Sequence, residues 1–388
     1  MATRDLPATA DAVVVGGGVM GASTAYHLAR RGMGNVVLLE REEYFGAMST
    51  GQCAGGIRHQ FSSETNVRLS VESIRMMERF PEEPGFPLDI NLCGYLILLS
   101  DEANVARFKQ NVELQRSLGV DTQWMDPSEI ADRVPRMNID GVLGGTYYSR
   151  DGLADPAGVV DGYVGGARRH GVTAAAGTEV TGIVMDRGRI SGVETDRGVI
   201  STPIVVNACG AWAPQLGAMV GVKIPIEPIR RQVFTTTEIP DLPPDFPFAV
   251  FFESALYFHP EGKGVLSGKS NHDETPGYKM EVDEDWEAAH LEEAMERFPP
   301  IGEAGILSHW AGLYEVTPDA HPIFGRIPEV EGFFVMAGFS GHGFMHGPIA
   351  GKLMAEEILD GKAETVDVSA FAFERFASGE LHPELNVI

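Results

Sequence analysis

Three glycines at a fixed spacing constrain this chain more than any other feature of its sequence. Gly16, Gly18 and Gly21 follow a short β-branched run, 11–15, and precede a stretch of helical periodicity. A second apolar run then ends at Glu40, nineteen positions after Gly21. A strand, a glycine-rich turn, a helix and a second strand form a βαβ unit. The chain is therefore predicted to have an α/β fold built on a parallel sheet.

Each part of this unit suits a dinucleotide. Gly16 permits a tight turn, Gly18 lets the backbone approach a pyrophosphate, and Gly21 lets the helix pack closely on the strand. The helix start, with Val19 and Met20, presents free N–H groups to phosphate oxygens. The carboxylate of Glu40 can bind a ribose 2′-hydroxyl and would repel a 2′-phosphate.

A second glycine cluster lies about 320 residues further on and also precedes a helix. It spans 338–347 and includes Gly338, Gly341 and Gly343. Two such loops fit an extended ligand with phosphates at one end and an electron-rich ring at the other. FAD has that shape, and a helix N-terminus would stabilise the negative charge of its reduced ring. An NAD-dependent dehydrogenase would explain the first loop only.

Composition excludes several classes of partner and of site. The chain has 388 residues and a formal charge of −25, which disfavours nucleic acid and anionic membranes as partners. The three cysteines form no CxxC pair, so neither a disulfide framework nor a thiolate metal site is expected. No apolar run reaches the ~18 residues of a membrane helix, and no signal peptide is recognised. A cytoplasmic protein is expected.

Periodicity and turn residues outline the rest of the chain. Helices are expected near 64–80, 103–118, 157–170 and 284–298, and after the second glycine cluster to about 359, with a further helix start at Asp126-Pro127. Residues 172–208 alternate like a β-meander, and 223–282 are strand-like. The last ten or so residues are expected to form a loose tail.

Apart from the first glycine loop and Glu40, few residues are candidates for substrate binding or metal binding. Arg58 follows two glycines, and its planar guanidinium suits a substrate carboxylate; a structural or surface salt bridge is the alternative. His342 and His346 have a zinc-like spacing, but no HExxH glutamate accompanies them, so no metal site is expected and they are assigned to pocket lining or packing.

Several strings together resemble the D-amino-acid-oxidase-like family of FAD enzymes, which includes sarcosine oxidase and glycine oxidase. They are the first glycine loop with Glu40, the segment 205–212, Thr317-Pro318-Asp319, and above all 338–344, Gly-Phe-Ser-Gly-His-Gly-Phe. The β-subunits of sarcosine oxidase and of dye-linked proline dehydrogenase look most similar. The resemblance covers almost the whole chain.

The resemblance implies a bilobed α/β fold whose two domains are interleaved along the chain. A Rossmann-like FAD-binding domain would combine 1–85, 145–220 and 320–388. A substrate-binding domain with a mixed antiparallel sheet would combine 86–144 and 221–319.

The resemblance also implies site residues. Arg58, in an Ile-Arg-His string, would hold the carboxylate of an amino acid substrate. Apart from the resemblance, Tyr257, His259 and His342 are candidates for polarising the substrate amine. The residues expected to bind FAD are Gly16, Gly18, Val19, Met20, Gly21, Glu40, Arg41, Ser49, Thr50, Gln52, Ala54, Gly55, Val180, Gly210, Trp212, Gly338, Ser340, Gly341, His342, Gly343, Phe344 and Met345.

Three departures from the family pattern bear on function. Gly51 and Gln52 stand where some relatives carry the histidine that links FAD, so a non-covalent flavin is expected. Met345 stands at the place of a lysine that binds the carboxylate in monomeric sarcosine oxidases. Leu266 stands at the place of the lysine that activates oxygen, and Lys269 is nearby.

Two functions of different classes follow. The first is oxidation of sarcosine, another N-substituted glycine or proline to an imine, by hydride transfer to the flavin, with hydrolysis afterwards and electrons passed to O2 or to a partner subunit. The second is a flavin-binding subunit or assembly factor without turnover of its own.

Overall fold

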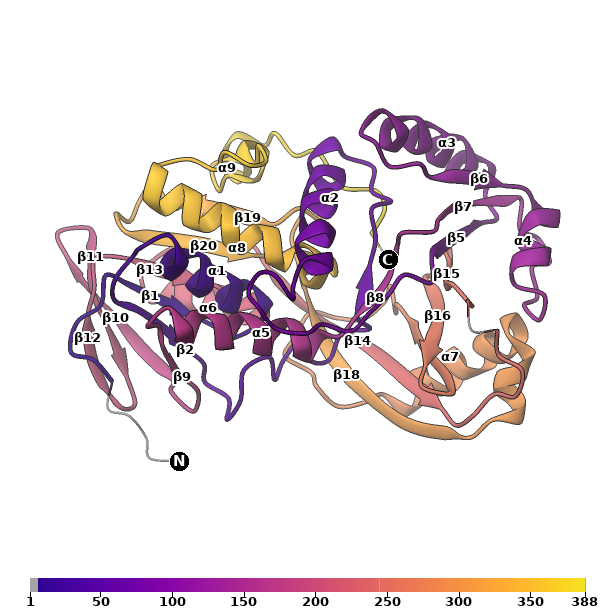
Figure 1. Cartoon of the computed structure of the whole chain (residues 1–388), viewed down its shortest axis with the longest axis horizontal. Helices are drawn as coiled ribbons and strands as arrows, with labels where there is room; N and C mark the ends of the chain where they lie inside the picture. The colour runs from indigo at the N-terminus through magenta and orange to yellow at the C-terminus, as the bar shows by residue number, and fades with distance from the viewer. Residues whose placement is uncertain (1–5, 244, 388) are drawn as a thin grey trace.

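The computed structural model describes residues 6–243 and 245–387 and shows an elongated molecule with two lobes (Figure 1). The first lobe is built on a six-stranded, mostly parallel sheet. In spatial order its strands are β19 (Ile323–Arg326), β20 (Phe333–Ala337), β13 (Val205–Asn207), β1 (Ala12–Val15), β2 (Val36–Leu39) and β9 (Thr173–Ala175). The predicted βαβ unit is confirmed, with α1 (Val19–Arg30) between β1 and β2.

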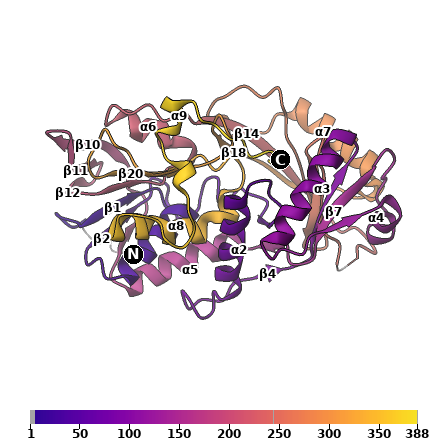
Figure 2. The same ribbon diagram turned by 90° about the horizontal axis from the view of Figure 1, so that it is seen from above.

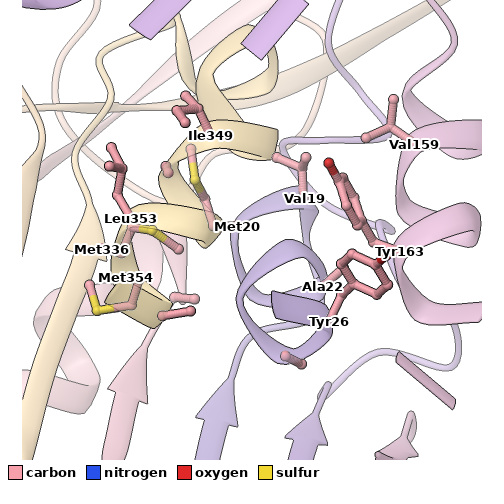
Figure 3. Close-up of a cluster of buried hydrophobic side chains, with 14 of the residues drawn as sticks. Val19, Met20, Ala22, Tyr26, Val159, Tyr163, Met336, Ile349, Leu353 and Met354 are labelled. Atoms are coloured by element: carbon pink, nitrogen blue, oxygen red, sulfur yellow. The ribbon is translucent and has the colours of Figure 1, made fainter. Parts of the chain in front are cut away.

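Helix α1 is almost completely buried because other helices cover it on two sides. It lies between α8 (Gly343–Asp360) and α5 (Pro156–Arg169), and Figure 3 shows Met20 facing the α8 residues Ile349 and Leu353 while Tyr26 lies near Tyr163. Small residues let α1 and α8 approach closely. A Cβ atom on Gly351 would lie 2.3 Å from the Ser23 hydroxyl oxygen.

The second lobe contains an eight-stranded mixed sheet. In order, its strands are β18 (Ile306–Val316), β14 (Glu227–Thr236), β17 (Gly264–Lys269), β16 (Leu256–Glu261), β15 (Phe248–Phe251), β5 (Tyr95–Leu99), β7 (Gly144–Tyr148) and β6 (Gln123–Met125). Only the β5–β15 pairing is parallel among the described strands of this sheet. The helices α3 (Glu102–Ser117), α4 (Pro127–Arg133) and α7 (Glu284–Arg297) pack on it.

Two small sheets complete the fold. One, at the far end of the first lobe, contains β10 (Val180–Asp186), β11 (Arg189–Thr195) and β12 (Gly198–Ser201) (Figure 1). The other contains β3 (Gly56–Ile57), β8 (Gly152–Ala154) and β4 (Ile90–Asn91). The remaining helices are α2 (Glu64–Glu78), α6 (Ala213–Ala218) and α9 (Arg375–Ser378), with short 3-10 turns at 210–212, 299–303 and 369–371.

The helix predictions are confirmed to within a residue or two. The prediction for 172–208 is only partly right. Strands β10 to β12 form the meander, whereas β9 and β13 join the parallel sheet beside β2 and β1. Alternation along a strand does not reveal its partner, which explains the error. Among the described helices, none has both the length and the apolar character needed to cross a bilayer.

The expectation of a loose C-terminal tail is wrong. After α9 the chain runs past α2 and ends between the two lobes, as both views show (Figures 1 and 2). Glu384 and Asn386 are buried there. The Glu384 carboxylate accepts hydrogen bonds from Ser62 and Ser63, at the start of α2, and from Asn66. These polar anchors hold a segment that has too few apolar residues to be recognised as ordered.

Candidate active site

A large cavity, with about 1350 Å³ of empty space, opens at the carboxyl ends of β1 and β2. This edge of a parallel sheet is where nucleotides bind in folds of this type. Most of the residues predicted to bind FAD line it: Gly16, Gly18, Val19, Met20, Glu40, Arg41, Ser49, Thr50, Val180, Gly210, Trp212, Gly341, Gly343 and Phe344.

The first glycine loop has the geometry that the spacing predicted. Gly16 has φ +106°, which favours glycine, and a Cβ atom there would lie 2.3 Å from the carbonyl oxygen of Ala208. A Cβ atom on Gly21 would lie 1.8 Å from the carbonyl oxygen of Gly16. Gly21 lies outside the cavity lining, so it supports the loop from behind and does not itself touch a ligand.

Side chains fix both edges of this loop. The Glu40 carboxylate accepts hydrogen bonds from the N–H groups of Gly17 (2.7 Å) and Glu42 (2.8 Å), which hold it at the cavity wall. The Thr50 hydroxyl accepts one from the N–H of Val19 (3.2 Å). The loop therefore borders the cavity with the N–H groups of Gly17 and Val19 bonded to side chains, and with the Glu40 carboxylate fixed at the wall.

The second glycine loop depends on a buried carboxylate that the sequence reasoning missed. One oxygen of Glu315, at the end of β18, accepts a hydrogen bond from the N–H of Gly338 (2.9 Å). Burial raises the pKa of Glu315 to about 7, although backbone N–H groups of the loop oppose the shift. Gly338 itself lies outside both cavities, against Thr317, so its predicted contact with the cofactor is corrected to a packing role.

A second cavity of about 820 Å³ adjoins the first. The two share lining residues, namely Ser49, Cys53, Leu313, Tyr314, Gly341 and Phe344. Several residues that the resemblance assigned to FAD line only this second space: Gln52, Ala54, Gly55, Ser340, His342 and Met345. A ligand ring at the junction would therefore face a chamber built from both lobes.

Arg58, which lines this chamber, makes no salt bridge within the described ranges. Its Nη1 and Nη2 groups donate hydrogen bonds to the main-chain carbonyls of Gln60 and Asn386, each at 2.5 Å. Its guanidinium lies 4.0 Å from the centre of the Phe61 ring. The side chain is thus fixed in place, and its guanidinium has no carboxylate partner among the residues described.

Three tyrosines surround the same space. Tyr257, predicted from the sequence, lines it together with Tyr95 and Tyr314, which were missed. Burial raises the pKa of all three phenols, so their hydroxyls stay protonated at neutral pH and act as hydrogen-bond donors. Tyr95 and Tyr314 come from β5 and β18, which four strands separate in the large sheet, yet both line this cavity.

Comparisons with known proteins agree with this geometry. A family model described as FAD dependent oxidoreductase matches residues 11–357. The chain belongs to this family. Human sarcosine dehydrogenase, a mitochondrial protein, is 33% identical over 96% of the chain, which spans only 42% of that longer protein. FAD-dependent oxidoreductase domain-containing protein 1 of Xenopus laevis is 32% identical over all of the chain and 86% of its own length.

A solved structure supports the family on the level of the fold. L-proline dehydrogenase from P. horikoshii is 36% identical, with a TM-score of 0.90 over 97% of this chain and all of its own. The expected α/β fold and the family are thus confirmed. FAD is the cofactor of the family, and the first cavity fits it, because the glycines leave room for a pyrophosphate and Glu40 stands where the ribose would lie.

In this FAD-dependent oxidoreductase, His342, which was predicted to polarise the substrate amine, uses its ring nitrogens in contacts within the protein. His342 lies at the chamber wall, but one ring nitrogen contacts the carbonyl of Ala320 (3.0 Å) and the other contacts His346 (3.2 Å). His346 in turn contacts the Ser70 hydroxyl (2.9 Å). Because a carbonyl only accepts, His342 donates to Ala320 and accepts from His346. Burial lowers the pKa of His342 to about 4, so it is neutral.

His259 requires the same correction. It is buried behind Phe248, outside the lining of both cavities, and its Nδ1 donates to the carbonyl of Pro260 (2.8 Å). Leu266 stands at the place of the oxygen-activating lysine of some relatives. Lys269 does not take over that place, because its ammonium pairs with Glu293 of α7 at 2.6 Å. Neither cavity is lined by a lysine within the described residues.

Proposed function

We propose that this protein oxidises the carbon–nitrogen bond of a small amino acid, such as sarcosine, proline or another N-substituted glycine, in the second cavity. The observation that carries the proposal is the position of Arg58. It is a buried guanidinium that pairs with no carboxylate of the described residues, in a chamber that opens onto the predicted flavin site. The names of the proline and sarcosine dehydrogenases to which the chain is similar agree with this substrate class.

The residues of the chamber bind and orient the substrate. Arg58 holds the α-carboxylate with the N–H groups left free by its two carbonyl contacts, and the tyrosine hydroxyls donate further hydrogen bonds. FAD, when bound, supplies the acceptor for the hydride of the substrate carbon. Placing that carbon against the flavin is mainly an effect of position and orientation.

The same residues do not remove the proton of the substrate ammonium. The tyrosines remain protonated, and both nitrogens of His342 are used within the protein. The substrate therefore reacts as the neutral amine present in solution. Turnover is expected to rise with pH until the amine is fully deprotonated.

Spectroscopy of the purified protein tests the proposal. The protein should be yellow, and anaerobic addition of sarcosine, proline, glycine or dimethylglycine should bleach the flavin with at least one of them. A yellow protein that none of these bleaches supports a flavin-binding subunit or assembly factor instead. A protein that neither carries nor binds FAD overturns both functions. Reoxidation in air, compared with reoxidation by a dye, identifies the electron acceptor.

A further inference from the structure

Two adjacent arginines on β14 face opposite sides of the large sheet. Arg230 points away from the chamber and pairs with Glu274 (2.7 Å) and Asp283 (2.8 Å). Arg231 points into it and, with Val233 two positions on, lines the second cavity. One guanidinium is thus neutralised by two carboxylates, and its neighbour is directed toward the space where the substrate would bind.

The charge of Arg231 is compensated less fully than that of Arg230. Its Nη1 donates to the carbonyl of Arg230 (3.0 Å), and its buried Nε–H has no hydrogen-bond partner among the residues that the structure describes. Its guanidinium lies 5.0 Å from the centre of the Tyr314 ring. No carboxylate of the described residues pairs with it. Burial lowers the pKa of Arg231 and outweighs the opposing effect of Glu274, whose carboxylate pairs with Arg230 and not with Arg231.

Arg58 and Arg231 occupy different parts of the chamber. Tyr95 lies within electrostatic range of Arg58, Tyr257 within range of Arg231, and Tyr314 within range of both. Tyr314 therefore lies near both guanidiniums, whereas Tyr95 and Tyr257 each lie near one. A carboxylate held by Arg58 would still leave Arg231 free for a second one.

A charge count favours a dianionic ligand. Among its described residues, the cavity lining contains two guanidiniums and no carboxylate, while His342 and the tyrosines are neutral. An amino acid with one carboxylate and a neutral amine compensates only one of these two cations, of which Arg58 is buried and Arg231 half-buried. A second carboxylate would compensate the other through a charge-assisted, bidentate contact.

We propose that Arg231 binds a second carboxylate of the substrate, so that the preferred substrates are amino dicarboxylates. This inference rests on the proposed function in one respect, because it takes Arg58 as the anchor of the α-carboxylate. The second carboxylate belongs either to the nitrogen substituent, as in N-(carboxymethyl)glycine, or to a side chain, as in glutamate.

Two ethers that contain no amine test the binding without any turnover. Diglycolate carries two carboxylates, and methoxyacetate is the same skeleton with one. Titration of the FAD-loaded protein by calorimetry should give a Kd for diglycolate about 10- to 100-fold lower than for methoxyacetate. Arg231→Met should remove this preference and change the methoxyacetate Kd less than about threefold. Arg58→Met should weaken both ligands.

Matched variants separate this role from a structural one. Arg230→Met, on the opposite face of the same strand, should keep the preference for diglycolate. Arg231→Lys keeps the positive charge and should therefore keep part of the preference for diglycolate. Equal affinities in the unchanged protein, or a preference that survives Arg231→Met, would overturn the inference. If Arg231→Met does not fold, the Kd values of the two ethers for the unchanged protein and for Arg231→Lys still test the inference.

The failure of this inference differs from the failure of the proposed function. Flavin bleached by sarcosine or proline, without a preference for diglycolate, contradicts only the second-carboxylate site. A preference that depends on Arg231, in a protein whose flavin no amine bleaches, contradicts only the oxidation. Faster bleaching by N-(carboxymethyl)glycine than by glutamate places the second carboxylate on the nitrogen substituent, and the reverse order places it on the side chain.

Discussion

The guanidinium of Arg58 donates a hydrogen bond to the main-chain carbonyl of Asn386, which lies 328 positions later in the sequence. The side chain of Asn386 contacts Asn111 and the carbonyl of Gln60, so Asn386 is held through both its side chain and its main chain. Val387 lines the second cavity. The C-terminal segment therefore forms part of the wall of the proposed substrate chamber and orients its arginine.

Replacement of Arg58 should affect substrate binding and not the flavin. We expect Arg58→Lys to raise KM about 10- to 100-fold, because an ammonium cannot make the bidentate contact of a guanidinium. Bound FAD should remain, since Arg58 lines only the second cavity. Steady-state kinetics and the visible spectrum measure both effects. An unchanged KM would remove Arg58 from the substrate site.

Glu384 should make the free energy of unfolding depend on pH in the acidic range. Its burial would raise its pKa, but hydrogen bonds from Ser62, Asn66 and Ser63 outweigh that effect and lower the pKa to about 2. Its contribution is therefore fully present above about pH 4.5 and is lost as the pH falls toward 2. Urea unfolding of the unchanged protein and of Glu384→Gln should differ by up to roughly 3 kcal/mol at pH 6.

The difference between these two proteins should shrink steadily below pH 4.5. Removal of residues 381–388 is a second variant for the same contact. It should weaken substrate binding as well as stability, because it removes both the Glu384 anchor and the carbonyl that holds Arg58. A truncated protein with unchanged KM would show that the segment contributes to stability but not to substrate binding.

The sequence alone predicted the parts of the site that depend on neighbours in the chain. The loop from Gly16 to Gly21 is defined by spacing, since a turn, a backbone approach and a helix contact follow one another within six residues. Arg58 could be proposed because two glycines precede it and a family string contains it.

Other site residues could not be found in this way, for physical reasons. Arg231 and Tyr314 lie on the same face of the sheet because of the register between β14 and β18, and a shift of one residue would put them on opposite faces. Asn386 follows a polar segment whose order comes from distant serines. Conversely, His259 and His342 have suitable chemistry, but their surroundings, invisible in the sequence, occupy or bury their nitrogens.

Gly21 should tolerate no side chain. A Cβ atom there would lie 1.8 Å from the carbonyl oxygen of Gly16, so Gly21→Ala should push the first loop out of place. We expect a loss of about 1–3 kcal/mol in stability and a large loss of bound FAD. Gly34→Ala is a matched control in the same βαβ unit, where the nearest atom would be 3.6 Å away. Thermal unfolding and the flavin content of the two variants give the comparison, and equal FAD retention would contradict it.

Glu315 should make the FAD-free protein less stable as the pH rises through neutrality. Burial raises its pKa to about 7, against about 4.5 when it is exposed in the unfolded chain. The folded state thus binds a proton more tightly, and this contribution is complete below about pH 4.5 and is lost as the pH rises through 7. Unfolding free energies between pH 5 and 8 should fall by roughly 2.5 kcal/mol more in the unchanged protein than in Glu315→Gln.

The same carboxyl should couple cofactor binding to pH, because it lines the FAD cavity and holds the N–H of Gly338. Above pH 7 its negative charge would face a ligand that already carries a pyrophosphate, which disfavours binding. FAD affinity should therefore decrease between pH 6 and 8 in the unchanged protein and vary less in Glu315→Gln. Fluorescence titration of the FAD-free protein measures this, and parallel pH profiles for the two proteins would exclude Glu315 as the titrating group.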